Sequence, residues 1–470
     1  MGRNKMLRTH TCGELRKEHK DQTVVLCGWV HRRRDHGKLI FIDIRDRYGI
    51  TQVVFVPSVA KDAHAEAQKL GPEFVVKLTG KVNVRPPKNV NAEIPTGEIE
   101  LTAEGLEILN TSKTPAFEVA EETEVGEDVR LTYRYLDLRR PKLLNALTLR
   151  SKLCAAIRQF LNQENFMEVE TPVLTKSTPE GARDFLVPSR LVPGSFFALP
   201  QSPQLFKQIL MVSGFDRYYQ IVKCFRDEDL RADRQPEFTQ LDMEMSFVDE
   251  EDVFALTERL FKMILKETKG IDIQTPFPRM THAEAMAKYK SDKPDIRKSP
   301  DEFAFLWVVD FPMFKYNEEE RRWESEHHPF TSMKEDDLIH LEKGEFKKIR
   351  ARSYDLVLNG NEIGSGSVRI HRREMQQKVF ETIGIGAEEA QERFGFLLRA
   401  FEYGAPPHAG VAYGIDRLVT ILSGLDSIRD VIAFPKTQSG SCLMTQAPSV
   451  VDQKQLKELG VMTIREVNHG

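Results

Sequence analysis

The chain has 470 residues, 40% of them hydrophobic and 29% charged, which is ample for more than one globular core. Its 67 Lys and Arg against 71 Asp and Glu give a net charge of -4, so a nucleic-acid partner has to be met by local basic patches. No apolar run approaches the roughly 20 residues of a membrane span, and the N-terminus lacks the apolar core of a signal peptide, so we expect a cytoplasmic protein without membrane contact. The five cysteines form no C-x-x-C pair, which indicates neither a disulfide framework nor a cysteine zinc site.

Short β-rich runs near the N-terminus predict a small antiparallel barrel. They lie at residues 24–30, 39–45, 50–56, 74–82 and 98–102. Five such runs in under about 100 residues, interrupted by a basic turn at 31–38, favour an oligonucleotide-binding barrel. In the second run the isoleucines share one face, which leaves Phe41 on the other. Its ring is either a platform for stacking a base or covered by another element.

A polar, proline-containing segment at 109–132 is predicted to link the barrel, residues 1–108, to a larger domain at 133–470. Apolar residues at helical spacing predict a helix that stops near Asn165, ahead of a strand that ends at Pro172. A second amphipathic helix is predicted around 253–264. Because no β-α-β rhythm follows, we expect an α+β fold with an antiparallel sheet flanked by helices.

Residues 225–242 are the most informative segment, since a loop dense in opposed charges joins two runs that alternate apolar and polar residues. The alternation predicts a rigid hairpin, which disfavours the alternative of a merely solvated loop. Arg226 and Arg234 suit phosphate oxygens, which guanidinium groups bind bidentately. The chain contains no P-loop sequence, so any ATP has to be held by arginines and carboxylates.

Two further segments contain candidate ligand-binding residues. Glu362 and Arg369 stand seven residues apart on a predicted strand whose glycines would leave room for a ligand, with a tight turn as the alternative. His327 and His328 form a pair that, taken alone, is more often structural than functional.

Together these motifs resemble those of the bacterial-type aspartyl-tRNA synthetases, which are class II aminoacyl-tRNA synthetases. The helix and strand ending at Pro172, the hairpin at 225–247 and residues 410–417 are similar to the three class II motifs. The resemblance implies an N-terminal five-stranded OB-type barrel that binds the anticodon, a class II catalytic domain, and a homodimer formed through the first motif. The large insert usual in bacterial relatives is reduced here to a short connection near 291–305.

The resemblance further implies an aspartate-tRNA ligase. It would activate L-aspartate with ATP and Mg²⁺ to aspartyl-adenylate plus diphosphate and transfer aspartate to the 3' end of tRNA(Asp). Because the amino acid's own carboxylate is the nucleophile, the protein supplies positioning and charge stabilisation. The implied catalytic residues are Arg226, Glu362 and Arg417. The implied ATP contacts are Arg226, Asp227, Glu228, Gln235, Phe238, Glu362, Gly414, Ile415, Asp416 and Arg417, and the implied magnesium ligands, which suit a hard cation, are Asp355 and Glu362.

The implied aspartate contacts are Glu180, Gln204, Lys207, Arg226, Gln240, Asp242, His327, His328 and Arg369, with His327 ranked before His328. Lys207 and Arg369 would receive the side-chain carboxylate of aspartate. Asparagine would leave two cations facing a neutral amide, so discrimination of about a thousandfold is expected without editing.

The implied anticodon contacts are Arg34, His36, Phe41, Gln52, Lys88 and Glu100. His36 resembles the relaxed enzymes, which also charge tRNA(Asn), whereas Lys88 resembles the strict ones, so both specificities stay open. An RNA-binding paralogue without catalysis is disfavoured because Arg226, Glu362 and Arg417 are all present. An asparagine synthetase built on the same core is disfavoured by the barrel.

Overall fold

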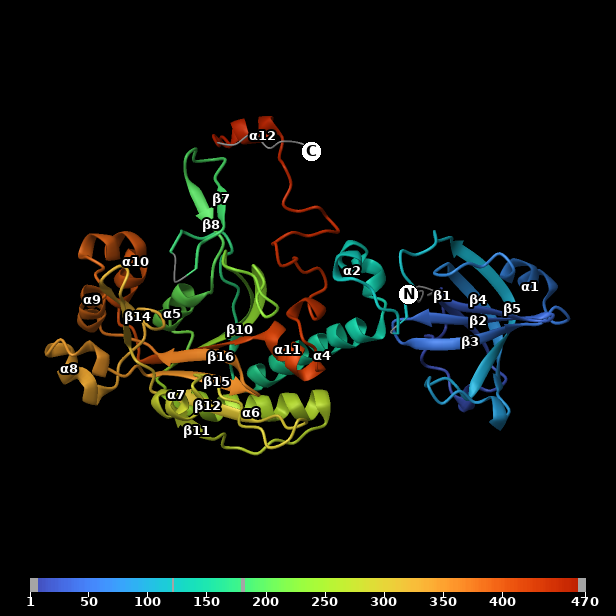
Figure 1. Ribbon diagram of the computed structural model, residues 1–470, viewed down its shortest axis with the longest axis horizontal. Helices are drawn as coiled ribbons and strands as arrows, with labels where there is room; N and C mark the ends of the chain where they lie inside the picture. The colour runs from blue at the N-terminus through green and yellow to red at the C-terminus, as the bar shows by residue number, and fades with distance from the viewer. Residues whose placement is uncertain (1–6, 121, 179–181, 464–470) are drawn as a thin grey trace. The chain divides into compact units, whose positions relative to one another are not determined.

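The computed structural model describes residues 7–120, 122–178 and 182–463. The chain divides into two compact units, Met1–Leu144 and Asn145–Gly470, each of which is described by itself (Figure 1). Within the described ranges, none of the helices combines the length and the apolar composition needed to cross a bilayer. The domain limits expected at 108 and 132 stay predictions.

The first unit contains a closed barrel of five strands in the order β1-β2-β3-β5-β4, which confirms the predicted OB-type barrel. Its elements are η1 (Lys17–His19), β1 (Thr23–His36), β2 (Leu39–Asp46), β3 (Gly49–Phe55), α1 (Lys61–Ala67), β4 (Val75–Val84), η2 (Pro87–Asn89) and β5 (Ile99–Asn110). Alternate residues of each strand fill the barrel interior, among them Leu26, Ile42 and Leu78, none of which has exposed surface.

The basic segment 31–38 is not the turn that the sequence suggested. Strand β1 continues through it to His36, and the turn to β2 contains only Gly37 and Lys38. The register shifts between Val30 and Arg32, as at a β-bulge, which lets one long strand bend without leaving the sheet. The arginines of this segment therefore lie on a strand that pairs with β2.

Three helices follow the barrel: α2 (Glu127–Thr132), α3 (Arg134–Asp137) and α4 (Pro141–Gln163). The end of α4 agrees with the predicted stop, because Asn165 adopts a left-handed conformation with φ of 61°.

The second unit is built on an eight-stranded sheet in the order β11-β12-β15-β16-β17-β10-β9-β6. The strands are β6 (Met167–Glu168), β9 (Arg217–Phe225), β10 (Glu237–Ser246), β11 (Arg279–Thr281), β12 (Phe305–Val309), β15 (Ser353–Leu358), β16 (Asn361–Val368) and β17 (His408–Gly414). The central strands are antiparallel, as predicted, whereas β11 and β6 pair in parallel with β12 and β9 at the two edges. The predicted hairpin at 225–242 is the β9–β10 hairpin.

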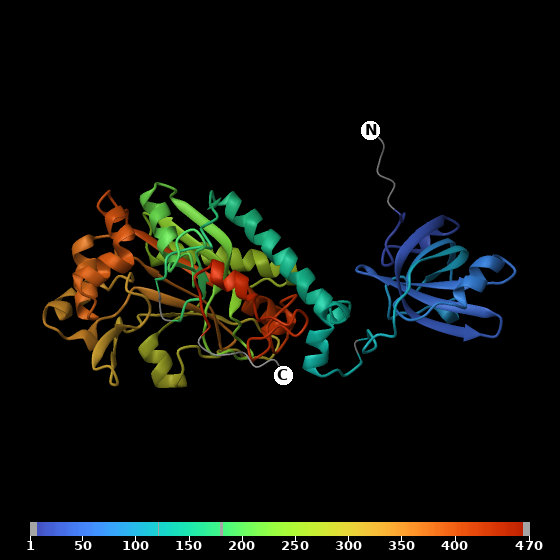
Figure 2. The same cartoon turned by 90° about the horizontal axis from the view of Figure 1, so that it is seen from above.

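Helices cover both faces of this sheet, and two small hairpins stand beside it. The remaining elements are β7 (Leu186–Pro188), β8 (Phe196–Ala198), α5 (Gln204–Val212), α6 (Glu250–Lys269), α7 (His282–Tyr289), β13 (Phe314–Asn317), β14 (Arg322–Ser325), η3 (Glu335–Asp337), α8 (Leu338–Glu342), η4 (Phe346–Lys348), α9 (Arg373–Thr382), α10 (Ala387–Phe401), α11 (Ile415–Ser423), η5 (Ile428–Asp430) and α12 (Gln453–Glu458). The long α4, teal in Figure 2, packs with α6 and α11 in one hydrophobic core against the sheet. The predicted helix at 253–264 is α6.

Candidate active site

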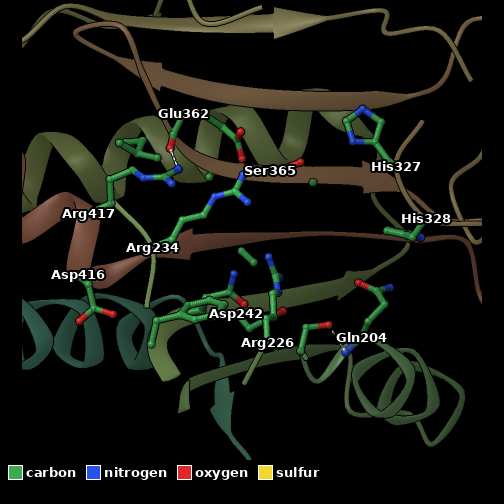
Figure 3. A pocket seen from close by; sticks show the side chains of 18 of the residues that line it. Gln204, Arg226, Arg234, Asp242, His327, His328, Glu362, Ser365, Asp416 and Arg417 are labelled. Carbon is green, nitrogen blue, oxygen red and sulfur yellow. Dashed lines mark hydrogen bonds between the residues drawn. The ribbon is translucent and has the colours of Figure 1, made fainter. Parts of the chain in front are cut away.

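The pleat of the central strands separates the hydrophobic core from a polar cavity. Along β10, Leu241 and Met243 belong to the core, whereas Gln240 and Asp242 line a cavity of about 450 Å³. Strand β16 contributes Ser365 and Ser367 to the same cavity, and β17 contributes Ala412. Figure 3 shows Asp416 and Arg417 toward one end of the cavity and His327 and His328 toward the other. The site thus rests on neighbouring strands of one rigid sheet.

Most of the residues expected at the substrates lie together in this cavity. Those that line it are Gln204, Lys207, Arg226, Glu228, Gln235, Phe238, Gln240, Asp242, His327, His328, Glu362, Arg369, Gly414, Asp416 and Arg417. Asp227, Asp355 and Ile415 are not among the lining residues, and Ile415 is buried in the hydrophobic core. Glu180 lies outside the described residues.

The glycines of β16 line the cavity, as the sequence suggested, but their Cβ positions face neighbouring residues of the sheet. A Cβ on Gly364 would lie 2.2 Å from the ring of Tyr413, and a Cβ on Gly366 would lie 2.2 Å from the carbonyl oxygen of Gly410. Because real Cβ atoms never approach so closely, these glycines permit close packing of β16 on its neighbours. Small residues of β16 thus line the cavity: Gly364, Ser365, Gly366 and Ser367.

Three arginines contribute positive charge to the cavity, with Arg417 toward the end that contains Asp416 and with Arg226 and Arg234 nearer the middle (Figure 3). The Arg226 guanidinium lies over the ring of Phe238, 5.0 Å from its centroid. Arg234 forms an ion pair of 3.2 Å with Glu228. Arg417 donates to the backbone carbonyl of Glu362 at 2.5 Å, so the guanidinium is fixed beside that carboxylate residue. Fixed, planar cations of this kind suit a polyphosphate.

Two residues expected to contact ATP use their polar groups for hydrogen bonds and ion pairs within the protein. The Gln235 amide exchanges two hydrogen bonds with the backbone of Lys436, at 2.9 and 2.8 Å. The Asp416 carboxylate accepts from the backbone N–H of Thr239 at 2.7 Å and pairs with Arg150. Both side chains are buried. Their role in this structure is to fix the β9–β10 hairpin and the start of α11.

The two carboxylates expected to hold magnesium come from paired strands. Asp355 on β15 stands opposite Ser365 on β16, and Glu362 lies three residues before Ser365 on the same strand. Asp355 is buried, and its Oδ1 has no hydrogen-bond partner among the described residues. Burial raises the pKa of Asp355 well above its ordinary value, and the neighbouring charge of Glu362 adds to the shift. A buried, unsatisfied carboxylate beside a second one fits a hard divalent cation such as Mg²⁺.

Four ionic groups meet at the other end of the cavity, and each is at most 2% exposed. Lys207 contacts Asp242 Oδ1 at 2.6 Å and Glu244 Oε2 at 3.1 Å. Arg369 donates from Nε to Glu244 Oε1 at 3.0 Å. Burial alone would raise the pKa of Glu244, but Arg369 and Lys207 outweigh it and lower that pKa to about 2. Glu244 is therefore ionised at neutral pH.

This pairing corrects the charge argument drawn from the sequence. Lys207 and Arg369 do not face the cavity as uncompensated cations, because Asp242 and Glu244 already neutralise them. Asparagine would therefore leave no unpaired charge behind. Discrimination against it has to come from the direction of the N–H groups, since an amide NH₂ placed against a donor loses a hydrogen bond. The alternation along β10, which puts residues 242 and 244 on one face, was the signal for Glu244.

The two histidines differ in what they contact. His328 is engaged at both ring nitrogens, with Nε2 2.6 Å from Arg369 Nη1 and Nδ1 3.2 Å from the backbone nitrogen of Phe330. The Nε2 atom of His327 is buried without a hydrogen-bond partner among the described residues. His327 thus has the ring nitrogen that a ligand could engage.

Stability below neutral pH is expected to depend on His327. Burial lowers its pKa from 6.5 to about 4, with the charge of neighbouring groups adding to the effect. Between these two values the unfolded chain binds a proton that the folded chain does not, so stability falls as the pH is lowered from 6.5 towards 4, by about 3 kcal/mol for this group. Urea unfolding of wild type and His327→Gln across this range should show a smaller loss in the variant. Equal losses would contradict the assignment.

The residues expected at the anticodon lie on the barrel strands, apart from Lys88 in η2. Arg34 donates to Asp43 at 2.8 Å and to Gln52 at 3.2 Å, and Gln52 donates to Glu100 at 2.9 Å. This chain of hydrogen bonds crosses β1, β2, β3 and β5 and holds several polar edges in place. The ring of Phe41 is half-buried and meets His36 edge to face, with 5.7 Å between centroids.

Residues 126–438 match the family described as tRNA synthetases class II (D, K and N), and residues 24–109 match the OB-fold nucleic acid binding domain. The chain belongs to the class II tRNA synthetases. Aspartate–tRNA(Asp/Asn) ligases are similar along nearly their whole length. The one from Thermoanaerobacter pseudethanolicus is 45% identical, covering 97% of this chain and 98% of its own, and the one from Dictyoglomus turgidum is 46% identical, covering 98% of both.

Solved structures of class II synthetases share the fold. Asparaginyl-tRNA synthetase from Pyrococcus horikoshii complexed with asparaginyl-adenylate superposes with a TM-score of 0.76 at 24% identity, covering 92% of this chain and 99% of its own. Aspartyl tRNA synthetase from Entamoeba histolytica gives a TM-score of 0.73 at 22% identity, covering 92% of both chains.

The synthetase is shorter than these bacterial relatives. The alignment with the Thermoanaerobacter ligase runs over 584 positions, whereas this chain has 470 residues, so the relative contains residues without a counterpart here. In the structure, only a short connection separates the end of α7 at Tyr289 from the start of β12 at Phe305. This is where the sequence suggested that an insert is missing, and the cavity is built from residues on either side of it.

Proposed function

We propose that this synthetase is an aspartate-tRNA ligase that activates L-aspartate with ATP and transfers it to tRNA in the cytoplasm. The observation that carries the proposal is the single cavity with Arg417 toward one end, the buried Lys207 and Arg369 toward the other, and Arg226 and Arg234 between them. A polyphosphate and a dicarboxylic amino acid fit these two ends. The names of the bacterial relatives support the choice of aspartate.

In the proposed first step, a carboxylate oxygen of aspartate attacks the α-phosphorus of ATP, and the bond to the diphosphate leaving group breaks. Arg226, which lines the cavity between its two ends, would stabilise the charge that develops on the α-phosphate. Arg417 would hold the terminal phosphate. Adenine would stack on Phe238, whose ring is covered by Arg226 in this structure, so that guanidinium has to shift or share the ring.

Asp355 and Glu362 would hold Mg²⁺, which supplies neutralisation of the phosphate charge when it is bound. Ser365 hydrogen-bonds the Asp355 carboxylate and so orients it. In the second step, a ribose hydroxyl at the 3' end of the tRNA attacks the carbonyl of aspartyl-adenylate, and AMP leaves. The site needs no nucleophilic side chain, because each step uses a nucleophile that a substrate brings.

We propose relaxed tRNA specificity, with both tRNA(Asp) and tRNA(Asn) as acceptors. The relatives named for both tRNAs and His36 in the barrel support this choice, whereas Lys88 favours strict specificity. The test has two parts. Aspartate should support exchange of pyrophosphate into ATP, and purified tRNA(Asp) and tRNA(Asn) should both be charged with aspartate. No exchange with aspartate would refute the ligase, and charging of tRNA(Asp) alone would refute the relaxed specificity.

Replacing Phe41 by alanine should weaken the binding of tRNA without affecting the formation of aspartyl-adenylate. A stacked base is worth about 1 to 3 kcal/mol, so we expect the KM for tRNA to rise by roughly 5- to 150-fold. Aminoacylation kinetics measure this change, and pyrophosphate exchange is the control because it needs no tRNA. An unchanged KM for tRNA would show that the ring only packs within the barrel.

We also propose a homodimer. The segment after α4 exposes apolar side chains, with Met167 at 54%, Val173 at 48% and Leu174 at 52% exposure, and the β7–β8 hairpin exposes Phe196 and Phe197. Neighbouring apolar side chains of this size usually meet a partner surface. Sedimentation equilibrium should give twice the chain mass of 53.9 kDa, and a monomer at micromolar concentration would refute the proposal.

A further inference from the structure

Glu244 lies directly behind the amino-acid end of the cavity. It follows Asp242 by two residues on β10 and therefore points to the same side of the sheet, yet it has no exposed surface and does not line the cavity. No substrate in the proposed reaction would touch it. Its carboxylate nevertheless contacts both cations that would receive the side chain of aspartate.

The contacts fix both cations at defined atoms. Arg369 donates from Nε to Glu244 Oε1 at 3.0 Å and from Nη2 to Oε2 at 3.2 Å, which is a bidentate pair. The Lys207 ammonium lies 3.1 Å from the same Oε2. One buried carboxylate thus sets the plane of the guanidinium and one direction of the ammonium.

These bonds leave a small, defined set of donors for a ligand. Arg369 has five N–H groups, and its Nη1 contacts His328 Nε2 and donates to Ser367 Oγ, both at 2.6 Å. Together with the two bonds to Glu244, three N–H groups are donated to oxygen acceptors. The second N–H of Nη1 points at His328 Nε2, which accepts it only in the tautomer with the proton on Nδ1, and the fifth N–H is on Nη2. Lys207 directs two of its three N–H groups toward Asp242 and Glu244. One donor from each cation matches the two oxygens of one carboxylate.

The backbone of β17 holds Glu244 in place from behind. A Cβ on Gly410 would lie 1.8 Å from Glu244 Oε2, so the carboxylate occupies the space that any larger residue would need. Strand β10 pairs Glu244 directly with Gly410. The position of the carboxylate is therefore fixed by its own strand, by its neighbour strand and by two cations.

We propose that Glu244 is a positioning residue that determines which N–H groups of Lys207 and Arg369 point at the side-chain carboxylate of aspartate. Two aligned N–H donors can each donate to one oxygen of a carboxylate. The amide of asparagine would instead place its NH₂ group, itself a donor, against one of them. Glu244 would thus set the preference for aspartate over asparagine without touching either. The inference rests on the proposed function.

A role as a mere counter-charge makes the opposite prediction. If Glu244 only neutralised the cations, its removal would leave extra positive charge and aspartate would bind more tightly. If it oriented them, its removal would misalign the donors and aspartate would bind more weakly. If it only supported the fold, ATP and aspartate would be affected together. The sign and the selectivity of the change therefore separate the three roles.

The test is Glu244→Gln in the full chain, assayed by pyrophosphate exchange with aspartate, asparagine and varied ATP. We expect the KM for aspartate to rise by about 10- to 100-fold, the KM for ATP to change less than about twofold, and the ratio of kcat/KM for aspartate over asparagine to fall about tenfold or more. Glu258→Gln is the matched control, because Glu258 is buried in the same unit and bonds Trp307 Nε1 at 3.2 Å, away from the cavity.

Gly410→Ala supplies a second variant that keeps the charge of Glu244. Its added Cβ would meet the carboxylate at 1.8 Å and the backbone carbonyl oxygen of Met243 at 2.4 Å, so its melting temperature is measured alongside the kinetics. It should change the constants in the same direction as Glu244→Gln, and the double variant should be no worse than the more impaired single one, since both act on one group. Gly105→Ala is its control, because the nearest atom to the added Cβ there is 3.7 Å away.

The outcomes separate the inference from the proposed function. A wild type that shows no exchange with aspartate refutes the ligase and the inference together. A wild type that exchanges with aspartate, combined with a Glu244→Gln variant that keeps the wild-type KM or binds aspartate more tightly, refutes the inference alone. Parallel loss of ATP and aspartate binding with a lower melting temperature also refutes it, in favour of a structural role.

Discussion

Replacing Arg226 by alanine is expected to lower the rate of aspartate-dependent pyrophosphate exchange by about a thousandfold, which corresponds to about 4 kcal/mol of transition-state stabilisation. Arg226 lines the cavity directly after the end of β9, where the loop of the β9–β10 hairpin begins, and its guanidinium lies over the ring of Phe238. A cation held at this place stabilises charge as it develops on the attacked phosphate. The loss should therefore appear mainly in kcat, measured at saturating ATP and aspartate.

The control for this variant is Arg231→Ala, on the same hairpin. Arg231 is exposed and does not line the cavity, so the change removes the same charge from the same element. We expect exchange to stay within about twofold of wild type in the control. Equal effects of the two variants would mean that the hairpin contributes only its general positive field, and the role given to Arg226 would be wrong.

Replacing Lys207 by methionine is expected to lower kcat/KM for aspartate by about a thousandfold and to destabilise the protein by about 3 kcal/mol. The first effect follows because one of the two proposed carboxylate donors is lost. The second follows because Asp242, whose carboxylate contacts Lys207 at 2.6 Å, would be left buried without its cation. Exchange kinetics measure the first effect, and urea unfolding measures the second.

Partial relief of the second effect is expected at low pH. Burial raises the pKa of Asp242, and Lys207 opposes that shift, so the carboxylate becomes neutral more readily once the lysine is gone. Lys223→Met, at an exposed position on β9, is the control for the loss of one lysine from the same sheet. A Lys207→Met variant as active as this control would refute the proposed aspartate site.

Local pattern was enough to predict the elements that carry the site. Apolar and polar residues alternate on either side of the charged loop because alternate residues of a strand face opposite sides of the sheet. This alternation predicted the β9–β10 hairpin. The helical spacing of apolar residues before Asn165 predicted α4 in the same local way. The grouping of the substrate residues came from the resemblance to a family, since no local pattern brings residues 207, 242 and 369 together.

The errors have a common physical cause, which is that register between distant strands is not written in any one segment. Glu244 meets Arg369 only because β17 lies between their strands and has a glycine at 410. The space beside Gly364 is filled by Tyr413 from another strand. Likewise, a β-bulge after Val30 allowed a charged segment to continue a strand where composition suggested a turn.

The four buried ionic groups at the amino-acid end, Lys207, Asp242, Glu244 and Arg369, carry no net charge between them. A pocket with only the two cations would bury unbalanced charge and would depend on its substrate to fold. This one is complete as a folding unit before any amino acid arrives. The binding energy of aspartate is then not needed to organise the protein and remains for the reaction itself.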